Sequence, residues 1–148
     1  MKKKNIDHYG VNAKEAFRSL SLSDNKQRNH ALKETAKLLK ANIDQILEAN
    51  KIDIENSQKK SVLNSFIDRL SLDKKRIYSI IDGLIDISKL EDPLNKVLST
   101  WDRPNGLNIS KISVPLGVIG IIYESRPNVT IDAGALCVKS GNTYILRG

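Results

Sequence analysis

The chain has 148 residues, of which 40% are hydrophobic and 28% charged, so it is long enough to bury the core of one ordinary globular domain. No apolar run approaches the ~20 residues that cross a bilayer, and no apolar stretch follows the basic start MKKKNIDHYG, which excludes a transmembrane helix and argues against a secretory signal. The single cysteine excludes an internal disulfide and is compatible with a reducing compartment, so we expect a cytoplasmic protein with no membrane partner.

The net charge of +7 does not predict nucleic-acid binding. Lysine outnumbers arginine 17 to 7, whereas base and phosphate recognition favours the arginine fork. The lysines are scattered along amphipathic segments, and only those at 2–4 form a run. Because no aromatic platform or recognition motif accompanies the charge, we expect no nucleic-acid partner.

The first two thirds of the sequence have the spacing of amphipathic helices. We expect helices over 6–20, from 24 to 47, over 62–70 and over 73–89. Ser23 or Asp24 can cap the second of these, and Asn42 divides it if it acts as a fresh cap. The polar stretch 50–58 predicts no definite structure, and Pro93 stops the last helix of this region.

An antiparallel hairpin is predicted next. The stretches 97–101 and 107–114 alternate apolar and polar residues, and the segment 102–106 between them contains a proline and an Asn-Gly pair, both strong turn signals. Trp101, the only tryptophan, is expected to act as a packing anchor.

The last segment predicts a strand, a helix and a second, parallel strand. The run 117–123 is continuously apolar, as a strand buried on both faces requires, and 129–139 reads as a buried helix that ends before a second strand at 143–147. In such sheets ligands gather at the carboxyl ends of the strands, here the loop 124–128 and the segment 147–148. The positive end of the helix points to the same edge, which suits an anion.

The fold class is therefore α/β, in three segments. Residues 1–93 form an N-terminal helical region, residues 94–115 a β-hairpin, and residues 116–148 an incomplete β-α-β unit of a nucleotide-binding sheet.

Several stretches of the sequence are familiar. VPLGVIGIIYESRPNVT at 114–130 and KSGNTYILRG at 139–148 closely resemble the gamma-glutamyl phosphate reductase (glutamate-5-semialdehyde dehydrogenase) family of the aldehyde dehydrogenase superfamily. Weaker support comes from LEAN at 47–50, DRLSL at 68–72 and DPLNKV at 92–97, and the resemblance is collinear over nearly the whole chain. It implies a truncated Rossmann-like NADP-binding unit, with the catalytic domain of the family absent.

The resemblance also implies an activity, an NADPH-dependent step of proline biosynthesis. In the family a cysteine thiolate attacks gamma-glutamyl phosphate, phosphate leaves, and hydride reduces the thioester to glutamate-5-semialdehyde. Asn128 matches the motif asparagine whose amide helps to hold the developing oxyanion. Arg147 matches the basic position near the ribose and 2′-phosphate of NADP(H).

Structural roles compete with both assignments. Asn128 is equally well placed to cap the helix that follows it. Glu124 and Arg126 are explained as a solvated loop pair, and Arg147 as a residue that binds nothing.

Cys137 lies within the predicted buried helix, where a cysteine is a core residue rather than a thiolate nucleophile. In the family the nucleophile belongs to a domain beyond residue 148. His8 and His30 have no partners at ligand spacing, so no metal site is expected.

Three interpretations follow. The chain is an inactive remnant of the reductase, such as a pseudogene encodes, or one half of a split enzyme that a complementary reductase half completes, or a helical binding module that lost the reaction. Of the three we favour the remnant, and we expect no activity from the chain alone. Because members of the superfamily associate through similar hairpins, self-association is a further expectation.

Overall fold

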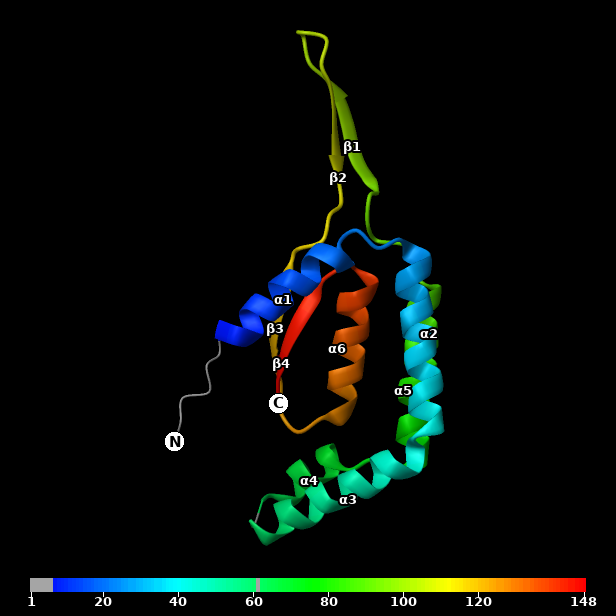
Figure 1. Cartoon of the computed structure of the whole chain (residues 1–148), viewed down its shortest axis with the longest axis vertical. Helices are drawn as coiled ribbons and strands as arrows, with labels where there is room; N and C mark the ends of the chain where they lie inside the picture. The colour runs from blue at the N-terminus through cyan, green and yellow to red at the C-terminus, as the bar shows by residue number, and fades with distance from the viewer. Residues whose placement is uncertain (1–6, 61) are drawn as a thin grey trace.

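Helices make up the first two thirds of the protein, as the periodicity predicts, in a computed structural model that describes residues 7–60 and 62–148 (Figure 1). The expected helix start at residue 6 and the basic run at 2–4 lie outside the described residues. The helices are α1 (Asp7–Leu20), α2 (Asn25–Ala41), α3 (Ile43–Lys59), α4 (Asn64–Leu70), α5 (Lys74–Lys89) and α6 (Pro127–Lys139), and the strands are β1 (Val97–Asp102), β2 (Asn108–Ile112), β3 (Val118–Ile122) and β4 (Thr143–Arg147).

Aspartate side chains start two of the long helices. Asp24 caps α2 in a reciprocal box: its carboxylate accepts from the backbone N–H of Gln27 at 2.7 Å, and the Gln27 side chain accepts from the backbone N–H of Asp24 at 2.9 Å. Asp73 caps α5 by accepting from the backbone N–H of Arg76. Of the two candidates for the start of α2, Asp24 is therefore the cap, and each such cap contributes about 1 kcal/mol.

Asn42 separates two helices but does not cap the second one. Its side chain donates to the carbonyl oxygen of Leu38 in the last turn of α2, and it makes no hydrogen bond to the first turn of α3. The predicted break is confirmed, and the predicted cap is wrong.

The polar stretch 50–58 is helical, and its first residue is held by a distant segment of the same chain. The buried amide of Asn50 donates to the carbonyl oxygen of Leu70 at 2.9 Å and accepts from the backbone N–H of Leu72 at 2.8 Å. These bonds fix α3 to the linker between α4 and α5. Neither partner is adjacent in sequence, so no local pattern could show them.

The core lies where α2, α5 and α6 meet (Figure 1). Its buried members are apolar residues at helical spacing on those three helices together with Ile43, and they are Leu32, Ala36, Ile43, Ile77, Ile81, Leu84 and Ala135. Because α6 shares this core with the helical region, these two segments share one core, and none of its members lies in the hairpin. The division at residues 93 and 115 stays a prediction. None of the described helices is long and apolar enough to cross a membrane.

Strands β3 and β4 pair in parallel and α6 connects them, as predicted. The hydroxyl of Thr143 donates to the carbonyl oxygen of Ala13 in α1, whereas the ring of the next residue, Tyr144, lies against Gly134 in α6. Since successive side chains of a strand point to opposite faces, α1 and α6 cover opposite faces of this two-stranded sheet (Figure 1).

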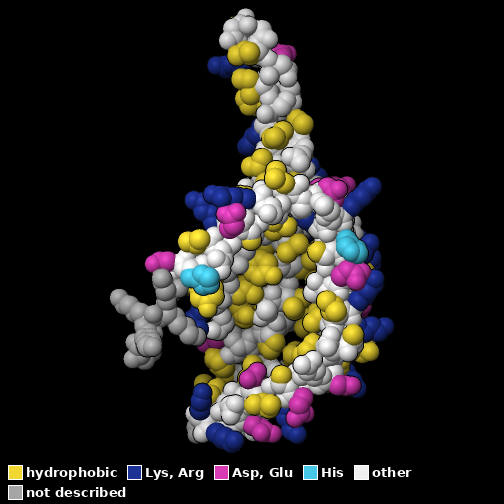
Figure 2. All heavy atoms as spheres, in the orientation of Figure 1, with side chains coloured by type: hydrophobic (Ala, Val, Ile, Leu, Met, Phe, Trp, Pro, Cys, Tyr) yellow, Lys and Arg dark blue, Asp and Glu magenta, His cyan; other side chains and the backbone are white. Residues whose placement is uncertain are grey.

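The prediction that β3 is buried on both faces is wrong. Its residues alternate between partly buried and exposed, and the side chain of Ile122 is 87% exposed. Helix α6 also presents Leu136 to solvent. The side chains of β3 are exposed because β4 is the only described strand beside β3 and because α1 covers little of β3. Figure 2 shows apolar side chains gathered in the hollow between α1 and α2.

The hairpin of β1 and β2 projects away from the helices (Figure 1). All of β1 is exposed, including Trp101, which is 42% exposed and pairs with Ile109 across the hairpin. The expected packing anchor is therefore wrong within the described residues, because no layer covers the arm. At its base, the hydroxyl of Ser113 donates to the carbonyl oxygen of Pro93 at 2.7 Å.

Candidate functional site

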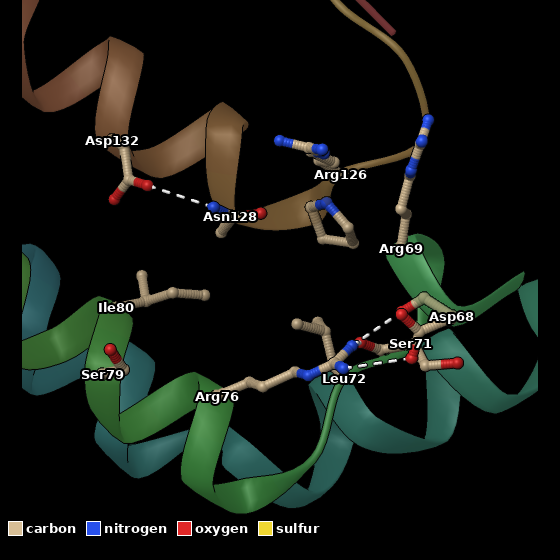
Figure 3. A pocket seen from close by; sticks show the side chains of 11 residues that line it. Asp68, Arg69, Ser71, Leu72, Arg76, Ser79, Ile80, Arg126, Asn128 and Asp132 are labelled. Atoms are coloured by element: carbon tan, nitrogen blue, oxygen red, sulfur yellow. Dashed lines mark hydrogen bonds and ion pairs between the residues drawn. The ribbon is translucent and has the colours of Figure 1, made fainter. Parts of the chain in front are cut away.

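A cleft of about 360 Å³ opens between the start of α6 and the linker that joins α4 to α5 (Figure 3). Most of its lining is polar or charged, and the lining residues are Asp68, Arg69, Ser71, Leu72, Arg76, Ser79, Ile80, Arg126, Pro127, Asn128 and Asp132. Two of the stretches that carry the family resemblance, DRLSL at 68–72 and RPN at 126–128, thus meet at one place.

The loop after β3 makes a sharp turn that places Arg126 at this cleft. Ser125 adopts the left-handed backbone region with φ of 49°, which is uncommon for a residue other than glycine, asparagine or aspartate. Pro127 follows at the first position of α6, where its fixed φ and missing N–H suit a helix start. The turn and the proline together set where α6 begins.

Asn128 lies inside α6, because the helix begins two residues earlier than the expected 129. Arg126 occupies the capping position without a side-chain hydrogen bond, so the capping role considered for Asn128 is wrong. The Asn128 amide instead donates to the carboxylate of Asp132 at 3.3 Å. An asparagine amide has two N–H donors, so one remains for a ligand in the cleft.

Three arginines surround the cleft, and only one of them is held firmly. Arg76 donates to the carbonyl oxygens of Asp68 and Ser71 at 2.7 and 2.6 Å, and to the Asp68 carboxylate at 3.3 Å. Arg69 lies 3.8 Å from Glu124, in a pair that is largely exposed on both sides.

The guanidinium of Arg126, the third arginine, makes no hydrogen bond or ion pair to any other described residue, and this side chain is exposed at the mouth of the cleft (Figure 3). The expected loop pair between Glu124 and Arg126 is wrong, because Glu124 is placed against Arg69 instead.

Sequence reasoning missed the contribution of α4 and α5 to this cleft. The DRLSL stretch could be noticed only as a resemblance, since Arg69 and Arg76 have no local pattern that separates them from solvated helix residues. What brings them to Asn128 is the packing of α5 against α6, which joins segments about fifty residues apart.

Arg147 lies outside the cleft, at the carboxyl end of β4. It is exposed, and its guanidinium donates only to the neighbouring carbonyl oxygen of Gly148, at 3.3 Å. The strand end itself is ordered by Tyr123, whose backbone N–H donates to the Arg147 carbonyl oxygen at 3.0 Å and whose hydroxyl bonds that of Thr130. A guanidinium with free donors at this edge fits a phosphate group.

Cys137 faces the interior, as predicted. The side chain is 6% exposed, unpaired with any other thiol, and burial raises the pKa of the thiol above its ordinary value. Both effects suppress the thiolate. Within the described residues, no three histidine, cysteine, aspartate or glutamate side chains are grouped so as to hold a metal ion.

We expect the thiol of Cys137 to react with an aromatic disulfide reagent at pH 8 at least ~10-fold more slowly in the native protein than in denaturant, because a buried, protonated thiol is a poor nucleophile. The matched control is the double variant L136C/C137S, which moves the cysteine one residue along α6 to an exposed position. Equal rates at the two positions in folded protein would contradict the burial.

The comparisons with known proteins agree on one group of relatives. A scan against models of protein families finds no match. Curated relatives named gamma-glutamyl phosphate reductase are 54% identical in Clostridium tetani, over 94% of this chain and 32% of that protein, and 52% identical in Clostridium novyi, over 97% and 36%.

Crystal structures agree. The gamma-glutamyl phosphate reductase of Thermotoga maritima superposes with a TM-score of 0.88 at 43% identity, covering 92% of this chain and 33% of that one. The enzyme of the same name from Saccharomyces cerevisiae gives 0.89 at 37% identity, covering 93% and 35%. The chain therefore spans about a third of the length of the relatives that it matches.

Proposed function

We propose a function on the premise that this chain is homologous to the N-terminal third of gamma-glutamyl phosphate reductases. It forms the part of such a reductase that supplies an oxyanion donor and a cofactor contact, and it needs the other two thirds of the fold to catalyse the reduction of gamma-glutamyl phosphate to glutamate-5-semialdehyde. Without them it is inactive.

The burial of the single cysteine is the observation that supports the need for the rest of the reductase fold. The family reaction needs a thiolate that can reach the acyl carbon of the substrate. Cys137 is the only cysteine of the sequence, and it is buried with a raised pKa on the core side of α6. No thiol of this chain can therefore serve as the nucleophile.

Asn128 is the oxyanion donor in this proposal. When a thiolate adds to the acyl carbon, negative charge grows on the carbonyl oxygen, and a fixed amide N–H stabilises it more than it stabilises the substrate. The hydrogen bond to Asp132 limits rotation of the amide, so its second N–H points in one direction. Removing one such donor lowers kcat about 10²–10³-fold.

Arg147 is the proposed contact for the 2′-phosphate of NADPH, a cofactor that supplies the hydride when bound. The exposed guanidinium at the end of β4 fits that phosphate in charge and in fork geometry. Arg147 thereby binds and orients the cofactor and takes no part in bond making.

The exposed apolar side chains on β3 and α6 favour a complementary reductase half as partner. Val118 and Ile122 on β3 and Leu136 on α6 are exposed, and they lie on opposite sides of the two-stranded sheet. A partner that adds strands to the sheet and packs against both sides removes these side chains from water. The exposed apolar residues of the hairpin favour self-association as a second interaction.

The test is growth of a reductase-deficient host without proline. We expect no rescue by this chain alone, and rescue when the remaining two thirds of the Clostridium tetani relative are co-expressed as a separate chain. In the reconstituted enzyme, Asn128→Ala lowers kcat about 10²–10³-fold. Asn105→Ala, in the exposed hairpin turn, is the matched control and leaves kcat unchanged.

Rescue by the chain alone would overturn the dependence on a second part. A co-expressed pair that is soluble and assembled yet inactive would instead support the inactive remnant.

A further inference from the structure

We propose that the cleft between α6 and the α4–α5 linker binds a small oxyanion, a phosphate or a carboxylate, through the guanidinium groups of Arg126 and Arg69. The inference deepens the proposed function, and rests on it, by giving the substrate's charged end a place beside Asn128. It adds a specificity role to two residues that have no part in the chemistry.

The charge inventory of the cleft leaves guanidinium donors free. Arg76 and Asp68 neutralise each other, whereas Asp132 accepts from the neutral Asn128 amide and keeps its negative charge. Glu124 lies at the rim, 3.8 Å from Arg69, too far for a hydrogen bond, and an exposed pair of this kind is worth little. Arg126 has no such partner among the described residues.

The fixed position of Arg76 gives the cleft a rigid wall. Its three hydrogen bonds tie α5 to the end of α4 and to the linker, so the backbone that carries Arg69 is held in place. A binding group mounted on a helix that does not rearrange loses less entropy when a ligand binds.

The start of α6 adds to the attraction for an anion. Its capping position carries no side-chain acceptor, so amide groups of the first turn have no side-chain partner, and the positive end of the helix dipole lies at Pro127 and Asn128, which line the cleft. Two exposed guanidinium forks next to a helix start are a combination suited to bidentate recognition of phosphate or carboxylate.

The ligand class follows from size and charge. A volume of about 360 Å³ accommodates a small metabolite rather than a macromolecule. Both ends of gamma-glutamyl phosphate are oxyanions, the phosphate at one and the carboxylate at the other, and both suit the cleft chemically. The two probes used below, inorganic phosphate and L-glutamate, distinguish binding of the phosphate end from binding of the carboxylate end.

The experiment titrates the isotope-labelled chain with inorganic phosphate and, separately, with L-glutamate at constant ionic strength. It follows the Nε–H signals of Arg69 and Arg126 and the side-chain amide signal of Asn128 by NMR. We expect saturable shifts of these signals, and a rise in Kd of about 10-fold or more in Arg126→Ala. Stronger binding of phosphate assigns the phosphate end to the cleft, and stronger binding of glutamate assigns the carboxylate end.

Two further variants make the result specific. Arg126→Lys keeps the charge and loses the fork, so it should bind more weakly than the wild type and more tightly than Arg126→Ala. Arg103→Ala, in the exposed hairpin turn, removes the same charge elsewhere and should leave Kd unchanged. Circular dichroism spectra identical to the wild type establish that each variant is folded.

Absence of saturable shifts with both probes would overturn the inference, and so would equal weakening by Arg103→Ala and Arg126→Ala. Neither outcome bears on the proposed function, because rescue of growth by the co-expressed pair is read independently. Conversely, anion binding by a chain that the second part cannot activate overturns the proposed function and leaves the oxyanion site standing.

Discussion

Arg28→Ala is expected to lower the free energy of unfolding by about 3–5 kcal/mol, the range for breaking a buried ion pair by removing one partner. Arg28 is 3% exposed, and its guanidinium donates to both carboxylate oxygens of Asp92 at 2.8 Å and to the carbonyl oxygen of Ser23. Removing Arg28 leaves the carboxylate of Asp92 and the carbonyl oxygen of Ser23 without this hydrogen-bond donor. Because the Asp92 side chain is 29% exposed and water can reach it, the lower end of the range is the better expectation.

Urea unfolding followed by circular dichroism measures this change. The matched control is Lys37→Ala, which breaks the pair between Lys37 and Glu34, 2.6 Å long but exposed on both sides. That variant should lose less than about 1 kcal/mol. Similar losses for the two variants would show that the burial of Arg28 contributes nothing.

The second large effect is expected at the centre of the core. Leu84→Ala should lower the free energy of unfolding by about 2–5 kcal/mol, since it removes apolar contacts and leaves a cavity that rigid neighbours fill only in part. Leu84 is 2% exposed on α5, among buried residues of α2 and α6. The loss therefore loosens three helices at once.

The control for this variant is Leu38→Ala on α2. Leu38 is 63% exposed, so the same chemical change there removes little burial and should alter the free energy of unfolding by less than about 0.5 kcal/mol. Denaturant midpoints compared at equal slopes give both values. A destabilisation at Leu38 as large as that at Leu84 would contradict the core described above.

Local signals in the sequence were enough to predict most elements of the fold. The Asp24 cap, the Asn-Gly turn of the hairpin and the strand–helix–strand order after Pro115 are all confirmed. Each depends on residues within a few positions of one another, and that is the range over which capping, turn and periodicity rules operate.

Contacts between distant segments were beyond that range. The cleft unites Arg69 with Asn128, and Asn50 is satisfied by the linker after α4, although neither partner is near in sequence. The apolar run of β3 predicted burial on both faces, and Ile122 is nevertheless exposed. The apolar composition of β3 shows that its side chains favour burial, whereas their actual exposure depends on which other elements cover the strand.

The strongest family motif also mixes two kinds of residue that the sequence could not separate. In KSGNTYILRG, Lys139 is buried and its ammonium donates to Asn25 and Asn29 at 3.0 and 2.7 Å. Asn142 is buried and accepts from the backbone N–H of Gly117 at 2.9 Å. Arg147 is exposed and keeps guanidinium donors free, so buried residues of the motif maintain the fold and its last arginine is available for binding.

The base of the hairpin gives the molecule a mechanical property. Asp92 is clamped by Arg28 at the start of α2, and the next residue, Pro93, is bonded to Ser113 on the returning strand side. The base of the hairpin is therefore held to the core helices by hydrogen bonds on both of its sides. We therefore expect a molecule bound at the tip of the hairpin to act on the first turn of α2 through these bonds.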